Sequence, residues 1–137
     1  MQMPMTATYT LTGTTELGYD DAVARVRETL KDEGFGVLTE IDVRATLKAK
    51  LDEDVEPYVI LGACNPPYAH QALALEPELG ALLPCNVVVY VDAEGATHVS
   101  GIDPVAMLGI VGRAELDPIA AEIRARIERA LTRVWEA

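Results

Sequence analysis

The sequence predicts an α+β fold in which a mainly antiparallel sheet packs on helices. Strand patterns and helix patterns follow one another along the chain, and the last two strand patterns are separated by a tight turn that contains glycine. The helical patterns are apolar on one side only, which suits helices that cover one face of a sheet. With 137 residues, the chain is expected to form a single domain, residues 1–137.

The first third of the chain predicts two strands and two helices. Residues 6–12 alternate between Thr and mostly apolar side chains, as in a half-buried strand. Residues 18–34 form a helix with acidic residues in its first turn and a glycine as its C-terminal cap. A short strand at 36–41 leads to Asp42, which caps a second helix. The buried positions expected of that helix are Val43, Leu47 and Leu51.

The middle of the chain predicts three strands and one helix. Residues 58–64 form the third strand, and Asn65 then caps a helix that ends near Leu75. Residues 85–91 form the fourth strand. Gly95 makes a hairpin between this strand and a fifth strand at 96–102.

Two Asp-Pro pairs, at 103–104 and 117–118, predict the remaining helices. In each pair, Asp is suited to the N-terminal cap of a helix and Pro is suited to the first helical position. The second pair opens the last helix. Its buried stripe is expected to be Ile119, Ile123, Ile127, Leu131 and Val134. Two opposite-charge pairs at i,i+4 spacing mark its wet side: Glu122–Arg126 and Arg124–Glu128.

The charge of the chain argues against a nucleic-acid partner. Its 22 acidic and 11 basic side chains give a net charge of −11, and no Lys or Arg occurs between Lys50 and Arg113. A nucleic-acid surface needs a basic stripe. The acidic segment 51–57 lacks the central Gly and final Glu of a calcium loop, so it is interpreted as a solvated turn.

The location expected from the sequence is the cytoplasm, with no membrane partner. The first residues have neither a basic region nor an apolar signal core. The longest apolar runs are far shorter than the ~20 residues that cross a bilayer. The cysteines are therefore expected to stay reduced.

Strands 58–64 and 85–91 are apolar on both faces. In a sheet with one solvent-exposed face, apolar and polar residues should alternate along each strand instead. Because the helices account for one face only, a second copy of the chain is expected to cover the other near Val88 and Tyr90. A homodimer interface of about 800 Å² per chain would suffice.

The only two cysteines, Cys64 and Cys85, stand at the end of the third strand and the start of the fourth. If these strands are antiparallel neighbours, both thiols lie at one edge of the sheet. If the strands are parallel, the thiols lie at opposite edges. The functional interpretation is a paired thiol site for metal binding, redox chemistry or covalent capture. The alternative is two small buried hydrophobic residues, which free cysteines often are.

The neighbours of Cys64 give opposing arguments about its reactivity. A position just before a helix favours a thiolate. However, Pro66 and Pro67 have no N–H, so two donors that would stabilise an anion are missing. The first free amide is that of Tyr68, and the Asn65 side chain is a candidate partner for it.

The two histidines, His70 and His98, are candidate general bases. No acid–base partner accompanies either of them, and no known catalytic, phosphate-binding or metal-binding motif occurs. Catalytic residues and metal ligands are therefore left unassigned.

Five segments carry a resemblance to a known family: GFGVLTEIDVRATLK, PYVILGACNPPYAHQAL, GALLPCNVVVYVD, HVSGIDPVAML and LDPIAAEIRARIE. From Tyr9 to Leu131 the chain resembles the bacterial domain of unknown function 302 family. The most specific segments are 63–66 (Ala-Cys-Asn-Pro) and 83–86 (Leu-Pro-Cys-Asn). Segment 112–115 departs from the family pattern, in which Asn-Pro commonly follows the Gly.

The resemblance implies an α+β domain with the topology of the TATA-binding protein: strand, helix, four strands, helix, with short extra helices, often as a dimer. This likeness concerns topology and carries no DNA function. It implies no activity and no cofactor, because the family is named for lacking a known function.

The function predicted from these observations is a cytoplasmic homodimer that binds a small ligand or has a thiol or metal site. The ligand-binding residues expected are Cys64, Asn65, Cys85, Asn86 and His70. The alternative is a structural or interaction module whose cysteines are core residues. Enzymatic activity and cofactor identity are left open.

Overall fold

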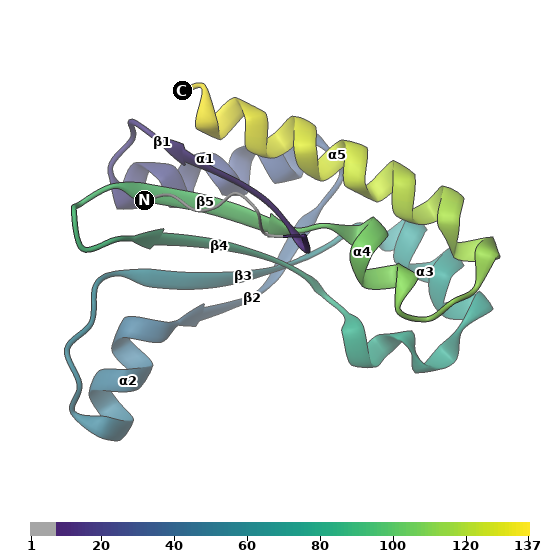
Figure 1. Cartoon of the computed structure of the whole chain (residues 1–137), viewed down its shortest axis with the longest axis horizontal. Helices are drawn as coiled ribbons and strands as arrows, with labels where there is room; N and C mark the ends of the chain where they lie inside the picture. The colour runs from purple at the N-terminus through teal and green to yellow at the C-terminus, as the bar shows by residue number, and fades with distance from the viewer. Residues whose placement is uncertain (1–7) are drawn as a thin grey trace.

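The computed structural model describes residues 8–137, and its strands form one antiparallel sheet (Figure 1). The strand order is β1-β5-β4-β3-β2. The strands are β1 (Thr10–Thr15), β2 (Gly36–Asp42), β3 (Tyr58–Cys64), β4 (Cys85–Val91) and β5 (Thr97–Ile102). The third and fourth strands have the bounds predicted from the sequence.

The α-helices are α1 (Tyr19–Asp32), α2 (Val43–Leu51), α3 (Pro66–Leu75), α4 (Pro104–Gly109) and α5 (Asp117–Trp135). Two short 3₁₀ helices are η1 (Pro77–Leu82) and η2 (Ala114–Leu116). Figure 1 shows α1 and α5 together on one face of the sheet, α3 and α4 at one end, and α2 apart from the others. The α+β prediction is confirmed. The long helices α1 and α5 come before and after the strands β2 to β5, and the shorter α2, α3 and α4 are the extra helices.

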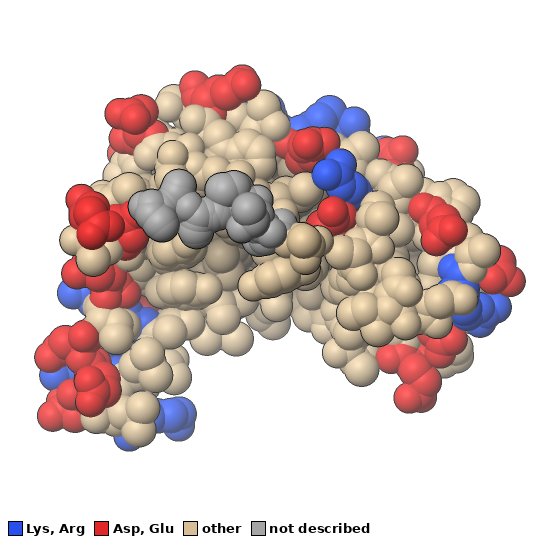
Figure 2. Space-filling view, viewed as in Figure 1, with Lys and Arg blue, Asp and Glu red and all other residues tan. Residues whose placement is uncertain are grey.

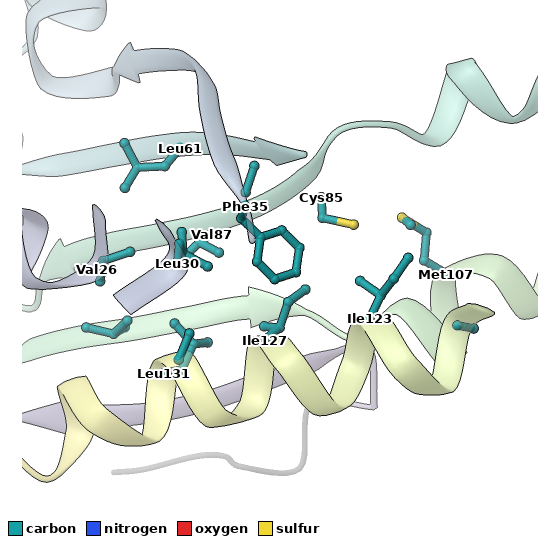
Figure 3. Packing of buried hydrophobic residues seen from close by; sticks show 14 of the residues in the cluster. Val26, Leu30, Phe35, Leu61, Cys85, Val87, Met107, Ile123, Ile127 and Leu131 are labelled. Atoms are coloured by element: carbon teal, nitrogen blue, oxygen red, sulfur yellow. The ribbon is translucent and has the colours of Figure 1, made fainter. Parts of the chain in front are cut away.

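The core lies between the sheet and the helix pair α1 and α5. Figure 3 shows side chains of α5 pointing toward the strands. All five positions of the stripe predicted for α5 are buried. The two predicted ion pairs also form, with a nitrogen–oxygen distance of 2.8 Å for Arg126–Glu122 and 3.4 Å for Arg124–Glu128.

Two glycines allow α5 to approach the sheet closely. A Cβ at Gly101 would lie 3.0 Å from Leu131. At the other end of the helix, a Cβ at Gly13 would lie 2.9 Å from the ring of Trp135. The indole Nε1 of Trp135 donates a hydrogen bond to the Val99 carbonyl at 2.9 Å. The last turn of α5 is thereby fixed to the sheet.

The predicted turns and caps are largely confirmed. Gly34 ends α1 and Gly95 lies in the β4–β5 turn, both with φ of +88°, where glycine carries no steric penalty. Asp103 accepts a hydrogen bond from the Val105 amide at 2.9 Å and caps α4. At the Asp117-Pro118 pair, Asp117 is already helical, because η2 leads directly into α5.

The first strand begins later than predicted. The sequence indicated residues 6–12, of which 6 and 7 lie outside the described residues, whereas β1 starts at Thr10. Thr10 pairs with Ile102, the last residue of β5, and beyond this pair the Asp103 amide still donates a hydrogen bond to the Tyr9 carbonyl at 2.8 Å. The strand also ends later than predicted, at Thr15, because β5 continues back to Thr97 as its partner. The Tyr9 side chain is 61% exposed.

The second helix forms as predicted, but its apolar stripe is not buried. Asp42 caps α2 by accepting a hydrogen bond from the Ala45 amide at 2.9 Å. No residue of α2 is buried, however, and Leu51 is 65% exposed. The prediction failed because α2 leaves β2 at the edge of the sheet and projects away from the α1–α5 layer (Figure 1).

The sheet face opposite α1 and α5, here called the outer face, is only partly covered. Its central side chains are half-buried: Tyr58, Ile60, Val88, Tyr90 and His98. Figure 2 shows a hollow on the underside of the molecule, between α2 and the η1 end, and its surface is almost free of charged side chains. Among the helices described, none has the length and apolar character needed to cross a bilayer.

Candidate functional site

A cavity of about 340 Å³ lies at the end of the sheet where β3 stops and β4 starts. Elements distant in sequence form its wall: β2, the β3 end, α3, η1, the β4 start, α4 and α5. Its interior is formed by buried apolar side chains: Phe35, Leu79, Met107, Leu108 and Ile123. Because these side chains also belong to the main core, the cavity is an extension of the core toward the surface.

The cavity opens between β2 and α3. Leu38 of β2 and Leu73 of α3 both line it, and they are 67% and 38% exposed. Thr39 and Pro84 also belong to the wall, and both side chains lie over Gly62 on the outer face. A Cβ at Gly62 would lie 2.8 Å from Pro84, so the glycine is needed for this closure. The cavity therefore reaches the outer face of the sheet.

Both cysteines line this cavity. β3 and β4 are antiparallel neighbours, with Ala63 opposite Cys85, so the first of the two predicted strand arrangements is confirmed. Cys64 is half-buried and Cys85 is buried, and both are free thiols. The two side chains lie on different faces of the sheet. Cys85 is paired with Ala63 on the core face, and because side chains alternate along a strand, the next residue, Cys64, lies on the outer face.

The environment of Cys85 keeps its thiol protonated. Burial, and to a lesser extent the nearby Cys64, raise the pKa of Cys85 to about 11. A thiolate is the reactive and metal-binding form of cysteine. At neutral pH, Cys85 therefore presents an uncharged sulfur to the cavity.

Asn65 lines the cavity, but its side chain does not cap α3. Its Nδ2 donates to the carbonyl of Glu33 at 3.3 Å, and the Arg126 guanidinium donates to the same oxygen at 3.1 Å. The predicted bond to the Tyr68 amide is therefore wrong. The side chain instead ties the start of α3 to the end of α1, and this contact fixes one side of the cavity.

The other two residues predicted for ligand binding lie outside the cavity wall. His70 is exposed on α3, and Asn86 is exposed on β4 one residue after Cys85. His98 is also distant from the cavity in the sheet, where its Nε2 lies 2.7 Å from Asp92 Oδ2. The structure thus brings together Cys64, Asn65 and Cys85, and leaves His70 and Asn86 apart from them.

Sequence reasoning missed the opposite wall of the cavity. η1 supplies Leu79, and α4 supplies Met107, whose sulfur points toward that of Cys85 in Figure 3. Within residues 8–137, no group of three His, Cys, Asp or Glu side chains is placed to hold a metal ion. Met107 nevertheless supplies a third sulfur to the lining of the same cavity.

Arg113 belongs to the segment that departs from the family pattern, and it holds the junction of α3 and η1. Its guanidinium donates a hydrogen bond to the Leu75 carbonyl and lies 3.7 Å from a carboxylate oxygen of Glu76. The departure therefore affects a contact behind the cavity wall and leaves the cysteines unchanged.

The fold and this site define an α+β protein with an apolar, cysteine-lined cavity at one end of an antiparallel sheet. The family model described as domain of unknown function DUF302 matches residues 11–134, and the chain belongs to the DUF302 family. The predicted family is therefore confirmed.

One solved structure extends the family match to the whole fold. The chain is similar to the crystal structure of an uncharacterized conserved protein DUF302 from Bacillus stearothermophilus, with 34% sequence identity and a TM-score of 0.87. The similarity covers 93% of this chain and 99% of that one. The comparison with curated proteins found no match.

Proposed function

We propose that this protein binds a small, uncharged and largely apolar ligand in the cavity at the end of the sheet. The cavity itself is the observation that carries the proposal. Its 340 Å³ falls at the lower end of the ~300–1,000 Å³ typical of small-molecule sites. Cys64, Asn65 and Cys85 would contact the ligand from one side.

The chemistry of the wall supports an uncharged ligand. None of the described residues that line the cavity is charged. A charged group moved there from water would lose its hydration without gaining a partner. The raised pKa of Cys85 adds a neutral, polarisable sulfur to this wall.

Thermal unfolding with toluene or indole as probes tests this proposal. A ligand that binds only the folded state raises its apparent stability. Ala72→Phe places a large side chain at a buried wall position and should abolish the shift. Ala74→Phe, at an exposed position of the same helix outside the wall, should preserve it. Absence of any shift with the unmodified protein would remove the proposal.

A second variant with a smaller side chain keeps the test valid if Ala72→Phe does not fold. Ala72→Leu adds less volume to the same wall, so it should fold and weaken the probe-induced shift in part. Circular dichroism of each variant confirms that its helices are intact. A full shift in both folded Ala72 variants would show that the probes bind elsewhere.

A second candidate is a thiol site for a soft metal ion. Cys64, Cys85 and Met107 line one cavity, and sulfur ligands of this kind select Cu(I). Bound metal would displace the thiol protons, so the raised pKa of Cys85 opposes binding but does not forbid it. Anaerobic titration with Cu(I) against a colorimetric chelator should show one tight site, lost in Cys85→Ser and weakened in Met107→Leu.

The alternative is a structural or interaction module in which the cysteines only fill the core. Cys85 does belong to the main core cluster. In that case Cys64→Ala and Cys85→Ala alter stability alone. Under the proposed function, they also change the affinity for the probes or for Cu(I).

We further propose that the protein works as a homodimer in the reducing cytoplasm. Both cysteines are free, which suits a reducing compartment. The half-buried apolar side chains of the outer face support association through that face.

A further inference from the structure

The segment that connects β3 to β4, residues 65–84, forms one side of the cavity and is here called the flap (Figure 1). It contains α3 and η1 and supplies the buried wall residues Ala72 and Leu79. Because Ala63 of β3 pairs with Cys85 of β4, the flap leaves and rejoins the sheet at neighbouring points. The position of its middle part is therefore set by its contacts with other elements.

The start of the flap is firmly attached. The Asn65 side chain donates to the carbonyl of Glu33, the residue that follows α1, at 3.3 Å. The guanidinium of Arg126 on α5 lies 5.4 Å from the centroid of the Tyr68 ring, in a cation–π contact. These two contacts hold the first turn of α3 against the α1–α5 pair.

The far part of the flap has one polar attachment. Its turn hydrogen bonds are internal, such as the bond from the Glu76 amide to the Ala72 carbonyl and that from the Leu79 amide to the Glu76 carbonyl. Among residues 8–137, Arg113 is the one residue outside the flap whose side chain forms a hydrogen bond or ion pair with it beyond Tyr68. Apart from this side chain, the far part is held by apolar packing.

Arg113 grips the flap at the junction of α3 and η1. Its guanidinium donates a hydrogen bond to the carbonyl of Leu75 and lies 3.7 Å from a carboxylate oxygen of Glu76. On its other side it lies 3.5 Å from a carboxylate oxygen of Glu115, in η2. The Arg113 side chain is partly exposed, and ion pairs of this kind contribute little to stability. Such an attachment can release locally while the rest of the fold stays intact.

The two rims of the cavity mouth differ in how they are held. Leu38, on one rim, is the extra residue of a bulge in β2 and has no pairing partner on β3. Bulges commonly redirect a side chain beside a functional site. This rim belongs to the sheet, whereas Leu73, on the other rim, belongs to the flap. Movement of the flap therefore changes the width of the mouth.

We infer that the flap is the gate of the cavity and that Arg113 is its latch. The inference rests on the proposed function, because it describes how the ligand enters and leaves. The flap turns outward about its anchored first turn, which carries Leu73 away from Leu38. This movement requires Arg113 to release the α3–η1 junction. Arg113 lies outside the cavity wall and acts on the ligand through the flap, so it is a positioning residue.

The kinetics of ligand exchange test the latch. A latch that holds the flap closed equally in the empty and the loaded protein affects rates and leaves affinity unchanged. Arg113→Ala should therefore raise kon and koff for fluorobenzene by the same factor, several-fold, with nearly constant Kd. Fluorine NMR exchange measurements give koff, and a titration gives Kd. A weaker Kd at constant kon would show that Arg113 only shapes the wall, and unchanged rates would remove the latch.

Two further variants separate the latch from a general loss of stability. Arg113→Lys keeps a positive charge and a donor, so it should return both rates part of the way to those of the unmodified protein. Arg133→Ala is the matched control, because Arg133 forms a partly exposed ion pair with Asp32 at 2.8 Å, between α5 and α1. It should leave both rates unchanged. Equal acceleration by Arg133→Ala and Arg113→Ala overturns the gate.

Labelling of Cys85 tests the gate without a ligand. Cys85 is buried in the cavity wall, so methyl methanethiosulfonate reaches it when the flap opens. In a Cys64→Ser background, where Cys85 is the only thiol, Arg113→Ala should raise the labelling rate several-fold. The rate should depend little on dilute urea, since a local opening exposes little surface.

The labelling result separates the gate from the ligand proposal. An unchanged labelling rate, or one that rises with urea as steeply as global unfolding does, overturns the gate. If labelling responds as expected but fluorobenzene does not bind, the ligand proposal fails alone and the gate remains. If fluorobenzene binds but neither exchange nor labelling responds to Arg113→Ala, the gate fails alone.

Discussion

The two faces of the sheet contain similar residues but experience different surroundings. On β3, Leu61 lies on the face covered by α1 and α5 and is fully buried, whereas its neighbour Ile60 lies on the outer face and is half-buried. Both side chains are apolar and of similar volume. Composition alone therefore does not distinguish a face that forms the chain's own core from one that lies partly open to solvent.

The largest expected difference between the faces is in the free energy of unfolding of two alanine variants. Leu61→Ala leaves a cavity in the closed core and should cost roughly 2–5 kcal/mol. Ile60→Ala should cost less, because the surroundings of Ile60 are partly solvent. Urea denaturation of both variants at the same protein concentration measures the difference. Equal losses would show that the outer face is as tightly packed as the core.

The buried thiol of Cys85, on the covered face of the sheet, should make the free energy of unfolding depend on pH. Because folding raises the pKa of Cys85 from an ordinary 9.0 to about 11, the unfolded chain loses this proton first as pH rises. Stability contributed by the protonated thiol is complete below pH 9 and lost toward pH 11, by roughly 3 kcal/mol at most.

Cys85→Ala is the control for that pH dependence. Tyrosines also ionise in this range, so the measured quantity is the difference between the unmodified protein and the variant. The unmodified protein should lose more stability between pH 9 and 11 than Cys85→Ala does. Parallel curves would mean that Cys85 is hydrated in the folded state.

Two glycines of the sheet should respond differently to an added methyl group. Gly101→Ala directs a Cβ to within 3.0 Å of Leu131 in the closed core, and overpacking of this kind costs about 1–3 kcal/mol. Gly36→Ala meets no atom within 4 Å and should be close to neutral. Thermal unfolding of the two variants decides whether the α5–sheet contact can relax.

The smallest effect is expected at the ion pair of the outer face. The hydrogen bond from His98 lowers the pKa of Asp92 below its ordinary 3.8. Because the folded-state pKa is lowered, the stabilisation is present above pH 3.8 and lost as pH falls through the lower value. Asp92→Asn should therefore flatten the acid limb of the stability curve slightly. An unchanged acid limb would show that the pair does not persist in solution.

The elements with strong local signals could be predicted from the sequence. The stripe from Ile119 to Val134 has the period of a helix. Pro57 and Asn65 flank β3, and Pro84 and Asp92 flank β4. The sequence left the shared location of the two cysteines open, because it did not decide between antiparallel and parallel strands. The antiparallel pairing of β3 and β4 in the structure settles it.

The features that failed or were missed depend on contacts distant in sequence. Periodicity identified α2 as amphipathic, but it does not reveal that nothing in the same chain covers Leu51. The cavity is formed by Phe35, Leu79 and Met107, which are separated by tens of residues and each read as an ordinary core residue. η1 was missed because a short 3₁₀ helix has no apolar period to detect.

The attachment of Trp135 to the sheet provides an intrinsic spectroscopic reporter. It is the only tryptophan in the chain, and its ring lies against Gly13 with the indole bonded to Val99. Its emission therefore reports whether the C-terminal helix is docked on β1 and β5. Because the cavity lies at the opposite end of that helix, ligand binding there should leave the emission wavelength unchanged, whereas detachment of the helix should shift it to the red.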